Sequence, residues 1–264
     1  MAPPSEKIGF WGPVTSTVDW CETNYEVSFY IAEFWNTISN VMMILPPLVG
    51  LLFAVKDAAE GRIVGCHIGL MLVGMGSWCF HMTLLYSSQL LDEMPMIWGT
   101  CFLIYTLYEV GSPPKSHNRI LQCVLLLYCL FVTVVYTTTH NVIFFQVSYG
   151  IMVFAIVACS IQVYRNFEHS NFLLVMGILT YGTGFLLWNV DNLYCENLRH
   201  LRQWLPAALR PLTQMHAWWH VGAGIGTYTS IIYAAHARLV YLKKNPVIEG
   251  SLLPIVRPGR EKAM

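Results

Sequence analysis

Seven long apolar stretches, separated by short polar segments, dominate the chain. Crossing a hydrocarbon core of about 30 Å takes about 20 helical residues, and each stretch comes close to that length. The pattern therefore predicts an all-α fold, a bundle of seven transmembrane helices. Their approximate bounds are 31–55, 63–85, 92–110, 120–136, 142–164, 172–190 and 216–242.

These stretches use most of the 264 residues, so we expect one membrane domain over 31–242. An N-terminal segment, 1–30, precedes it, and a tail, 243–264, follows it. The start of the chain lacks the basic, then apolar, then small-residue pattern of a removable signal peptide. We therefore expect the first helix itself to direct insertion into the membrane.

Lysine and arginine are distributed unevenly between the two sides that seven crossings would create. One side carries four: Lys7, Arg199, Arg202 and Arg210. The other side carries eleven: Lys56, Arg62, Lys115, Arg119, Arg165, Arg238, Lys243, Lys244, Arg257, Arg260 and Lys262. Because cytoplasmic loops carry the excess of basic residues, the count predicts a cytosolic C-terminus and a lumenal N-terminus.

The composition excludes several classes of protein. Hydrophobic residues make up 55% of the chain and charged residues 11%, against about 25% charged in soluble domains. The 15 basic residues are balanced by 15 acidic ones, so there is no basic excess for nucleic acid. The eight cysteines include no CxxC pair, which argues against a zinc ribbon.

Ionisable side chains inside the predicted helices are few, and each is a functional candidate because its burial in lipid is costly. His81 and Asp92 lie near the same end of the second and third helices, and Ser77 lies one turn below His81. The seventh helix opens with His216 and His220, an i,i+4 pair on one face. Three imidazoles with an open fourth position are the ligand set of a catalytic zinc site.

Other interpretations of the histidines remain open. His216 and His220 could be hydrogen-bonded interior or interfacial residues beside Trp218 and Trp219. A haem with two histidine ligands is the other metal hypothesis, but it leaves the third histidine and Asp92 unexplained. Imidazole also suits several divalent metals, so the ligand type does not distinguish zinc from the others.

The N-terminal segment offers oxygen ligands of the kind that calcium prefers. Asp19, Glu22 and Asn24 lie close together, and Glu33 stands at the mouth of the first helix. The spacing does not match an EF-hand, and a solvated acidic turn is the alternative interpretation. Glu33 favours a cation, because a carboxylate that enters a bilayer needs a partner.

Two cysteines stand apart from the six within the predicted helices. Cys21 and Cys195 both fall on the side assigned to the lumen, where disulfides persist. They could form a bridge between the N-terminal segment and the end of the sixth helix. The sequence provides no geometry for the pair, so free thiols remain the alternative.

Several motifs along nearly the whole chain resemble the alkaline ceramidase family, most closely its phytoceramidase-type (type 3) animal branch. The motifs are Trp11-Gly12-Pro13, Thr15-Ser16-Thr17, Asp19-Trp20-Cys21-Glu22, Ala32-Glu33-Phe34-Trp35-Asn36, Gly74-Met75-Gly76-Ser77-Trp78-Cys79-Phe80-His81, Leu90-Leu91-Asp92-Glu93, Trp188-Asn189-Val190-Asp191-Asn192 and His216-Ala217-Trp218-Trp219-His220. The wider superfamily of seven-helix hydrolases and adiponectin/progestin-type receptors shares only the Ser77/His81, Asp92 and His216/His220 skeleton.

The resemblance implies a role for each matched position. It implies zinc on His81, His216 and His220, with Ser77 and Asp92 beside it. It implies calcium on Asp19, the backbone of Trp20, Glu22, Asn24 and Glu33. It further implies a lumenal bridge between Cys21 and Cys195, and residence in endoplasmic reticulum and Golgi membranes.

The function expected from these observations is intramembrane, zinc-dependent and calcium-supported hydrolysis of ceramides, including phyto- and dihydroceramides, to a sphingoid base and a fatty acid. Asp92 is the expected general base, and Ser77 the residue that stabilises the oxyanion or positions Asp92. The expected partner is a membrane lipid substrate, with no nucleic acid and no protein partner. The alternative is a seven-helix lipid-sensing receptor of the adiponectin/progestin type, although the predicted cytosolic connections are short for a coupling surface.

Overall fold

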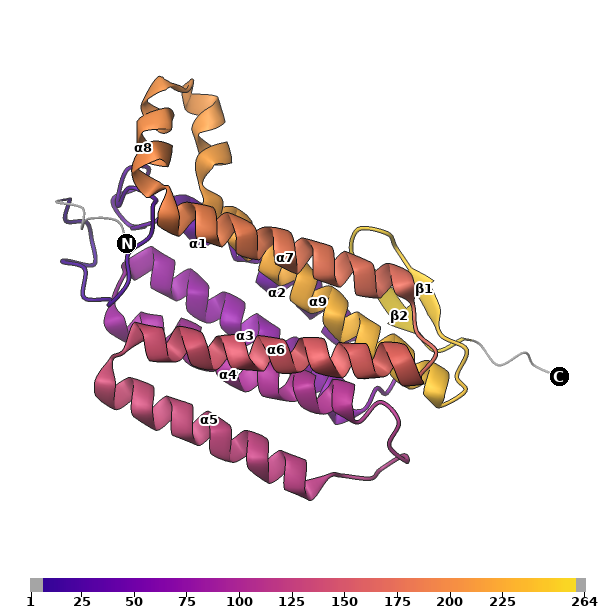
Figure 1. Ribbon diagram of the computed structural model, residues 1–264. Coiled ribbons are helices and arrows are strands. Elements are labelled where there is room, and N and C mark those ends of the chain that lie inside the picture. The colour runs from indigo at the N-terminus through magenta and orange to yellow at the C-terminus, as the bar shows by residue number, and fades with distance from the viewer. Residues whose placement is uncertain (1–6, 260–264) are drawn as a thin grey trace. The chain divides into compact units, whose positions relative to one another are not determined.

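The computed structural model describes residues 7–259, and these are mostly helical (Figure 1). The first half of the chain forms α1 (Phe34–Ser39), α2 (Val41–Lys56), α3 (Gly61–Thr83), α4 (Tyr86–Tyr108) and α5 (Arg119–Thr139). The second half forms α6 (Val142–Asn166), α7 (Asn171–Leu193), α8 (Cys195–Trp204), the 3₁₀ helix η1 (Ala207–Thr213) and α9 (Met215–Tyr241). A short antiparallel hairpin, β1 (Val247–Glu249) and β2 (Ile255–Arg257), follows.

Helices occur at all seven predicted positions, and the all-α prediction is confirmed for the described residues apart from the short hairpin. Two bounds differ in an informative way. The first helix is broken at Asn40 into α1 and α2, and α4 begins at Tyr86 rather than Asp92, because polar residues such as Gln89 hid its first turns. Neither α8 nor η1 was predicted.

The prediction of seven membrane-spanning helices is wrong by the measure of length and apolar composition. Within residues 7–259, five segments are long and apolar enough to cross a membrane. They are Phe34–Lys56, Gly61–Thr83, Arg119–Thr139, Val142–Asn166 and Asn171–Leu193. Helices α4 and α9 are long enough, but α4 carries Gln89, Asp92 and Glu93 in its first turns, and α9 carries three histidines and Arg238. These polar side chains lower the hydropathy of both helices.

The first and last residues, 1–6 and 260–264, lie outside the described residues. The expectation that the chain has no signal peptide rests on the first of these segments. Arg260 and Lys262, which entered the charge count for the tail, belong to the second.

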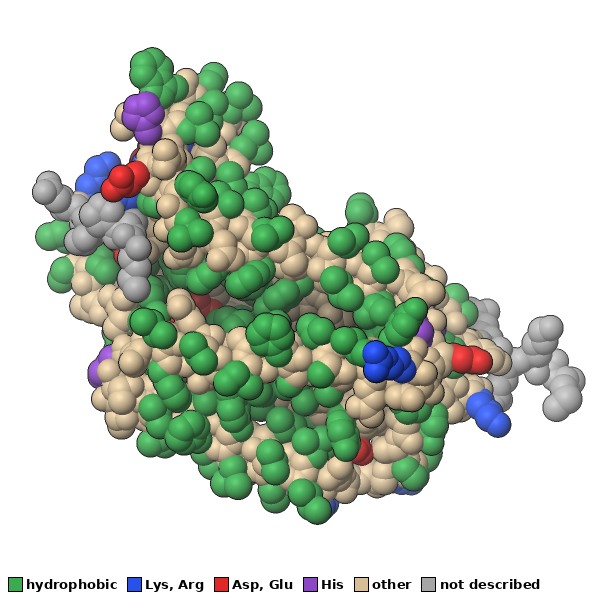
Figure 2. Space-filling model, viewed as in Figure 1, with side chains coloured by type: hydrophobic (Ala, Val, Ile, Leu, Met, Phe, Trp, Pro, Cys, Tyr) green, Lys and Arg blue, Asp and Glu red, His purple; other side chains and the backbone are tan. Residues whose placement is uncertain are grey.

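Hydrophobic side chains dominate the face in Figure 2, and charged ones are sparse on it, as expected for helices that face lipid.

The chain divides into two compact units, and the first contains all the predicted site residues. It consists of the described part of Met1–Leu45, together with Met71–Pro95 and Ile178–Gly226. Glycines allow its helices to approach closely. A Cβ atom on Gly222 would lie 2.7 Å from the Cα atom of Gly184, so α7 and α9 meet near His220. A Cβ atom on Gly76 would overlap the Leu91 carbonyl, so α3 and α4 meet beside Ser77.

The second unit consists of Pro46–Leu70, Met96–Gly177 and the described part of Thr227–Met264. Its core includes a buried arginine, Arg238, which donates to the Glu60 carboxylate at 2.6 Å and to the Val110 carbonyl at 2.9 Å. The hairpin is held to the end of α2 by Arg257 and Asp57, which form a bidentate ion pair at 2.8 Å. An apolar cavity of about 1160 Å³ lies within this unit.

Candidate metal centre

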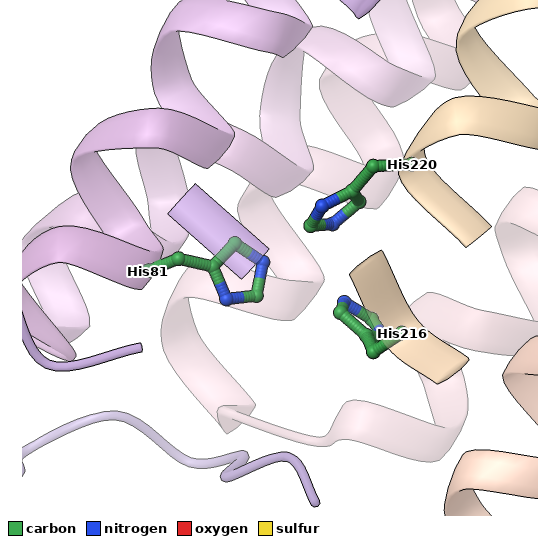
Figure 3. A group of neighbouring side chains, drawn as sticks. All are labelled: His81, His216 and His220. Atoms are coloured by element: carbon green, nitrogen blue, oxygen red, sulfur yellow. The ribbon is translucent and has the colours of Figure 1, made fainter. Parts of the chain in front are cut away.

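Three imidazoles meet inside the first unit (Figure 3). His81 comes from the last turn of α3, and His216 and His220 come from the first two turns of α9. One ring nitrogen of each lies within 4.8 Å of those of the other two, and all three side chains are buried. The i,i+4 spacing places His216 and His220 on one face of α9, so α3 needs to supply only one further ligand. The group matches the predicted zinc ligands.

Two nitrogen atoms in this group lack a hydrogen-bond partner among residues 7–259. They are Nε2 of His81 and Nδ1 of His216, and both are buried. An orphaned buried nitrogen is costly, because it has lost its water and gained nothing in exchange. A divalent metal ion would satisfy such nitrogens, and three neutral imidazoles suit zinc. The residues present therefore fit the metal that the sequence predicts.

Each histidine is held in place by a contact outside the group. His81 Nδ1 lies 2.5 Å from Oε2 of Glu33, which leaves Nε2 for a metal. His220 Nδ1 lies 2.8 Å from Oγ of Ser39 and 3.0 Å from the carbonyl oxygen of Asn36. The His216 ring stacks on Trp20 with a centroid distance of 3.8 Å. Hydrogen-bonded partners such as those of His81 and His220 orient metal-ligating histidines and set their tautomers, and stacking on Trp20 fixes the plane of the His216 ring.

Ser77 and Asp92 face each other from α3 and α4. The Ser77 hydroxyl donates a hydrogen bond to the Asp92 carboxylate, and Ser77 itself is buried. Ser77 lies one turn before His81 on α3. Among residues 7–259, the close group of potential metal ligands comprises the three histidines without Asp92. The arrangement leaves the Asp92 carboxylate available for proton transfer.

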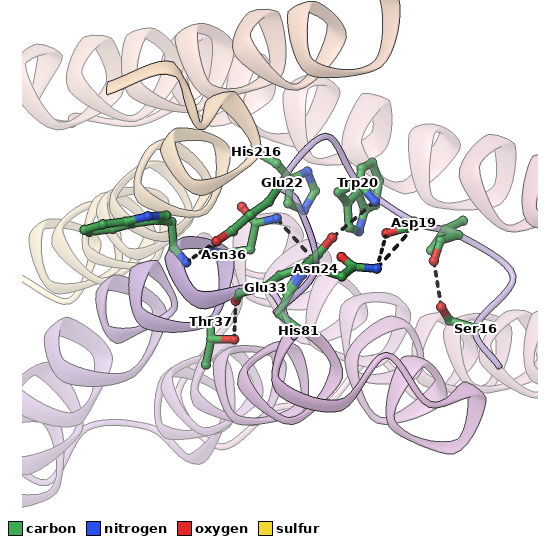
Figure 4. Close-up of polar contacts among 12 residues, drawn as sticks. Ser16, Asp19, Trp20, Glu22, Asn24, Glu33, Asn36, Thr37, His81 and His216 are labelled. Atoms are coloured by element: carbon green, nitrogen blue, oxygen red, sulfur yellow. Dashed lines mark hydrogen bonds and ion pairs between the residues drawn. The ribbon is translucent and has the colours of Figure 1, made fainter. Parts of the chain in front are cut away.

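The predicted calcium ligands lie around the start of α1 (Figure 4). The Asp19 and Glu33 carboxyl groups are close enough to interact electrostatically, and Glu33 Oε1 accepts from the Trp20 amide at 3.3 Å. Asn24 is turned toward Asp19, with its Nδ2 atom 3.5 Å from both carboxylate oxygens. The Oδ1 atom of Asn24 is buried and has no hydrogen-bond partner among residues 7–259. An orphaned carbonyl oxygen beside carboxylates is a suitable ligand for a hard cation.

Burial and mutual repulsion disfavour the ionised form of these carboxyl groups when no cation is bound to them. Burial raises the pKa of Asp19 to about 7, and the nearby charge of Glu33 adds to the rise. Burial also raises the pKa of Glu22 to about 8, again with a contribution from Glu33. Carboxylates that repel one another in a desolvated site are stabilised by a divalent cation.

Glu22 also has a structural role that its sequence position did not reveal. Its two carboxylate oxygens accept from the backbone amides of Trp35 and Asn36, each at 2.8 Å. These amides belong to the first turn of α1, where four N–H groups lack helical partners. Glu22 therefore caps α1, and a cation ligated by Glu22 would also be tied to this helix.

A disulfide between Cys21 and Cys195 joins the N-terminal segment to the start of α8. Asp191 reinforces this junction, since its carboxylate accepts from the amides of Cys21 at 3.1 Å and His216 at 3.2 Å. The sequence placed Asp191 in one of the motifs that resemble the family but did not identify its partners. It gave no signal for Arg202, whose buried guanidinium donates to the Cys21 carbonyl at 2.7 Å.

Comparison with known proteins identifies the family. A family model described as Ceramidase matches residues 12–252. Alkaline ceramidase 3 of mouse is 44% identical over 250 residues, which cover 94% of this chain and 94% of that protein. The chain belongs to the alkaline ceramidase family. An alkaline ceramidase of Saccharomyces cerevisiae is 32% identical over 91% of this chain and 82% of its own, and one of Arabidopsis thaliana is 34% identical over 96% of both chains.

These comparisons confirm the predicted membership of the alkaline ceramidase family and its likeness to type 3. They also confirm the prediction of an enzyme, because alkaline ceramidases are hydrolases that cleave the amide bond of ceramide. None of the relatives named above is a receptor, so the receptor alternative gains no support.

Proposed function

We propose that this alkaline ceramidase hydrolyses ceramides, including phyto- and dihydroceramides, to a sphingoid base and a free fatty acid with a metal ion held by His81, His216 and His220. The convergence of these three buried imidazoles, two of them with orphaned nitrogens, carries the proposal. The names of the relatives support the substrate class. The predominantly apolar surface in Figure 2 suits a substrate drawn from lipid.

The chemistry divides between the metal site and the Ser77–Asp92 pair. A bound zinc ion would supply Lewis acidity for both the amide carbonyl and the attacking water. Asp92 accepts a proton from that water as its oxygen bonds to the carbonyl carbon. It then delivers the proton to the sphingoid nitrogen as the C–N bond breaks, which releases a carboxylic acid and an amine. The Ser77 hydroxyl holds the Asp92 carboxylate in position.

Calcium is the second proposed cofactor, on Asp19, the Trp20 backbone, Glu22, Asn24 and Glu33. The orphaned Asn24 oxygen and the raised pKa of Asp19 and of Glu22 support a cation here. Because Glu33 also contacts His81, the ion would act on the order of the metal site rather than on the reacting bond. Calcium would therefore support turnover without contacting the substrate.

The membrane placement completes the proposal. The five apolar segments cross the bilayer, and the polar residues of α4 and α9, such as Gln89, His216 and His220, are buried within the protein. The N-terminal segment is then lumenal, the tail is cytosolic, and the compartments are the endoplasmic reticulum and the Golgi.

The decisive experiment measures fatty acid and sphingoid base release from long unsaturated-chain ceramide by the purified protein in detergent with calcium. We expect release by the wild type and by His117→Ala, an exposed histidine, and a loss beyond detection in His220→Ala. Metal analysis of each preparation accompanies the assay. Full turnover by His220→Ala, or none by folded wild type that contains zinc, would contradict the proposal.

A further inference from the structure

The segment between α7 and α9 forms a rigid hairpin of α8 and η1. Arg202, buried on α8, donates to the Thr213 hydroxyl and to the Thr213 carbonyl, each at 3.0 Å. It also donates to the Cys21 carbonyl, while Cys195 at the start of α8 is bonded to Cys21. The hairpin is thus fixed to the N-terminal segment at two places. The outer surface of the hairpin is therefore already ordered before it contacts anything else.

Helix α8 has three distinct faces, since successive residues are rotated by about 100°. Cys195, Leu198 and Arg202 form the buried face. A polar flank exposes Glu196, His200 and Gln203, while Arg199 beside it donates to the Cys21 carbonyl at 3.2 Å. The opposite flank exposes Leu201 and Trp204, at 46% and 77% of their surface, with the exposed Asn197 between them. An exposed apolar flank beside a polar one is typical of a helix that lies at a membrane surface.

The same kind of surface continues along η1 and back to α7. Residues three apart eclipse each other on a 3₁₀ helix, so Leu209 and Leu212 share one side of η1, and they are 45% and 55% exposed. Leu193 and Tyr194, between α7 and α8, are 73% and 56% exposed. Figure 2 shows hydrophobic side chains gathered over this projecting hairpin, at the upper left.

The direction of the hairpin decides what this surface meets. In Figure 1, α8 and η1 run across the direction of α7 and α9 and project to one side of them. Helix α7 is one of the apolar segments long enough to span a membrane, and its exposed apolar side chains continue to Leu193. A helix that crosses the direction of a spanning helix at its end lies along the bilayer surface.

We propose that the α8–η1 hairpin is an interfacial anchor, whose Leu201, Trp204, Leu209 and Leu212 enter the headgroup region of the leaflet at which α7 ends. Trp and Tyr are enriched at this depth, and the polar flank of α8 faces water. Continuity with the lipid-facing side chains of α7 favours lipid over a protein partner. The proposal rests on the membrane placement proposed above for α7.

The test uses tryptophan fluorescence of the full protein in bilayers of brominated phosphatidylcholine. The difference between wild type and Trp204→Phe isolates the signal of Trp204. Lipids brominated near the headgroup, lipids brominated deep in the acyl chain, and iodide in the water report three different depths. Two matched variants in the Trp204→Phe background carry a new tryptophan: Gln203→Trp on the polar flank of α8, and Leu186→Trp on α7, where Leu186 is 66% exposed.

We expect shallow bromine to quench Trp204 at least about twofold more than iodide does, because interfacial side chains sit about 5–10 Å deep. The tryptophan at position 203 should show the reverse, and the one at position 186 should respond most to deep bromine. Trp204 quenched mainly by iodide would overturn the proposal, and so would protection from all three quenchers, which would indicate a protein partner. If the tryptophan at 186 ignored both lipids, the membrane placement of α7 would fail and the anchor with it.

Discussion

Glu33 Oε2 lies 2.5 Å from Nδ1 of His81, so a carboxylate of the proposed calcium site touches a proposed zinc ligand directly. Both side chains are fully buried. The contact orients the imidazole so that its other nitrogen, Nε2, is left for a metal. Glu33 therefore links the two proposed metal sites, and a change in the occupancy of either site should alter metal binding at the other.

The first prediction concerns this shared residue. Glu33→Gln should weaken zinc binding by about 10- to 100-fold, because loss of the partner of a ligating histidine costs about that much. It should also abolish the response of turnover to calcium. Zinc content after dialysis against a weak chelator and turnover with and without calcium measure the two effects. Glu26→Gln, an exposed carboxylate of the same segment, should change neither; an unchanged Glu33→Gln enzyme would contradict the coupling.

Asp92 should be separable from the metal ligands. Asp92→Asn should lower kcat by about 10²- to 10⁴-fold, the usual contribution of a general base, while the zinc content stays at the wild-type level. Ser77→Ala should cost less, since the serine acts by holding the carboxylate. Turnover and metal analysis of the same preparations test both statements. Loss of zinc from Asp92→Asn would instead make this residue a ligand.

The disulfide should contribute to stability. Cys21 and Cys195 are 174 residues apart, so their bond restricts a very long loop in the unfolded chain. Cys195→Ser should therefore destabilise the protein by about 2–5 kcal/mol, seen as a lower thermal midpoint in detergent. Cys123→Ser, at an exposed free thiol, is the matched control and should leave the midpoint unchanged. Equal midpoints for both variants would remove this role.

A pH-dependent contribution to stability is expected from Glu60. Burial raises the pKa of this carboxyl group, but hydrogen bonds and charge from Arg238 and Arg62 outweigh burial and hold the pKa below its usual 4.5. A lowered pKa means that the folded state favours the carboxylate, so this stabilisation is present above pH 4.5 and is lost as the pH falls through the folded-state pKa.

Wild type should accordingly be more stable than Glu60→Gln at neutral pH, and the two midpoints should converge as the pH falls from 6 to 3, roughly the range over which a carboxylate with a lowered pKa becomes protonated. Thermal unfolding in detergent across that range measures the difference. Glu168→Gln, at an exposed position, should track the wild type throughout. A gap that stays constant with pH would show that Glu60 acts through packing alone.

The local sequence pattern determined the helix positions, the pairing of two candidate metal ligands and the family. The positions of the long helices follow from apolar stretches, because burial and backbone hydrogen bonding depend on residues a few positions apart. The pairing of His216 with His220 on one face follows from helical geometry in the same way. The motifs around His81 and Asp92 were sufficient to indicate the family.

Tertiary packing decided the rest. Glu33 meets His81 across 48 positions, and Asp191 links Cys21 to His216, because helices distant in sequence pack side by side. No periodicity reports such contacts. The α8–η1 hairpin escaped prediction because its polar residues mask a helix that a disulfide and Arg202 hold in place. Tertiary packing also explains why α4 and α9 tolerate polar residues. Each of these residues is covered by a neighbouring helix, and only the folded chain supplies that neighbour.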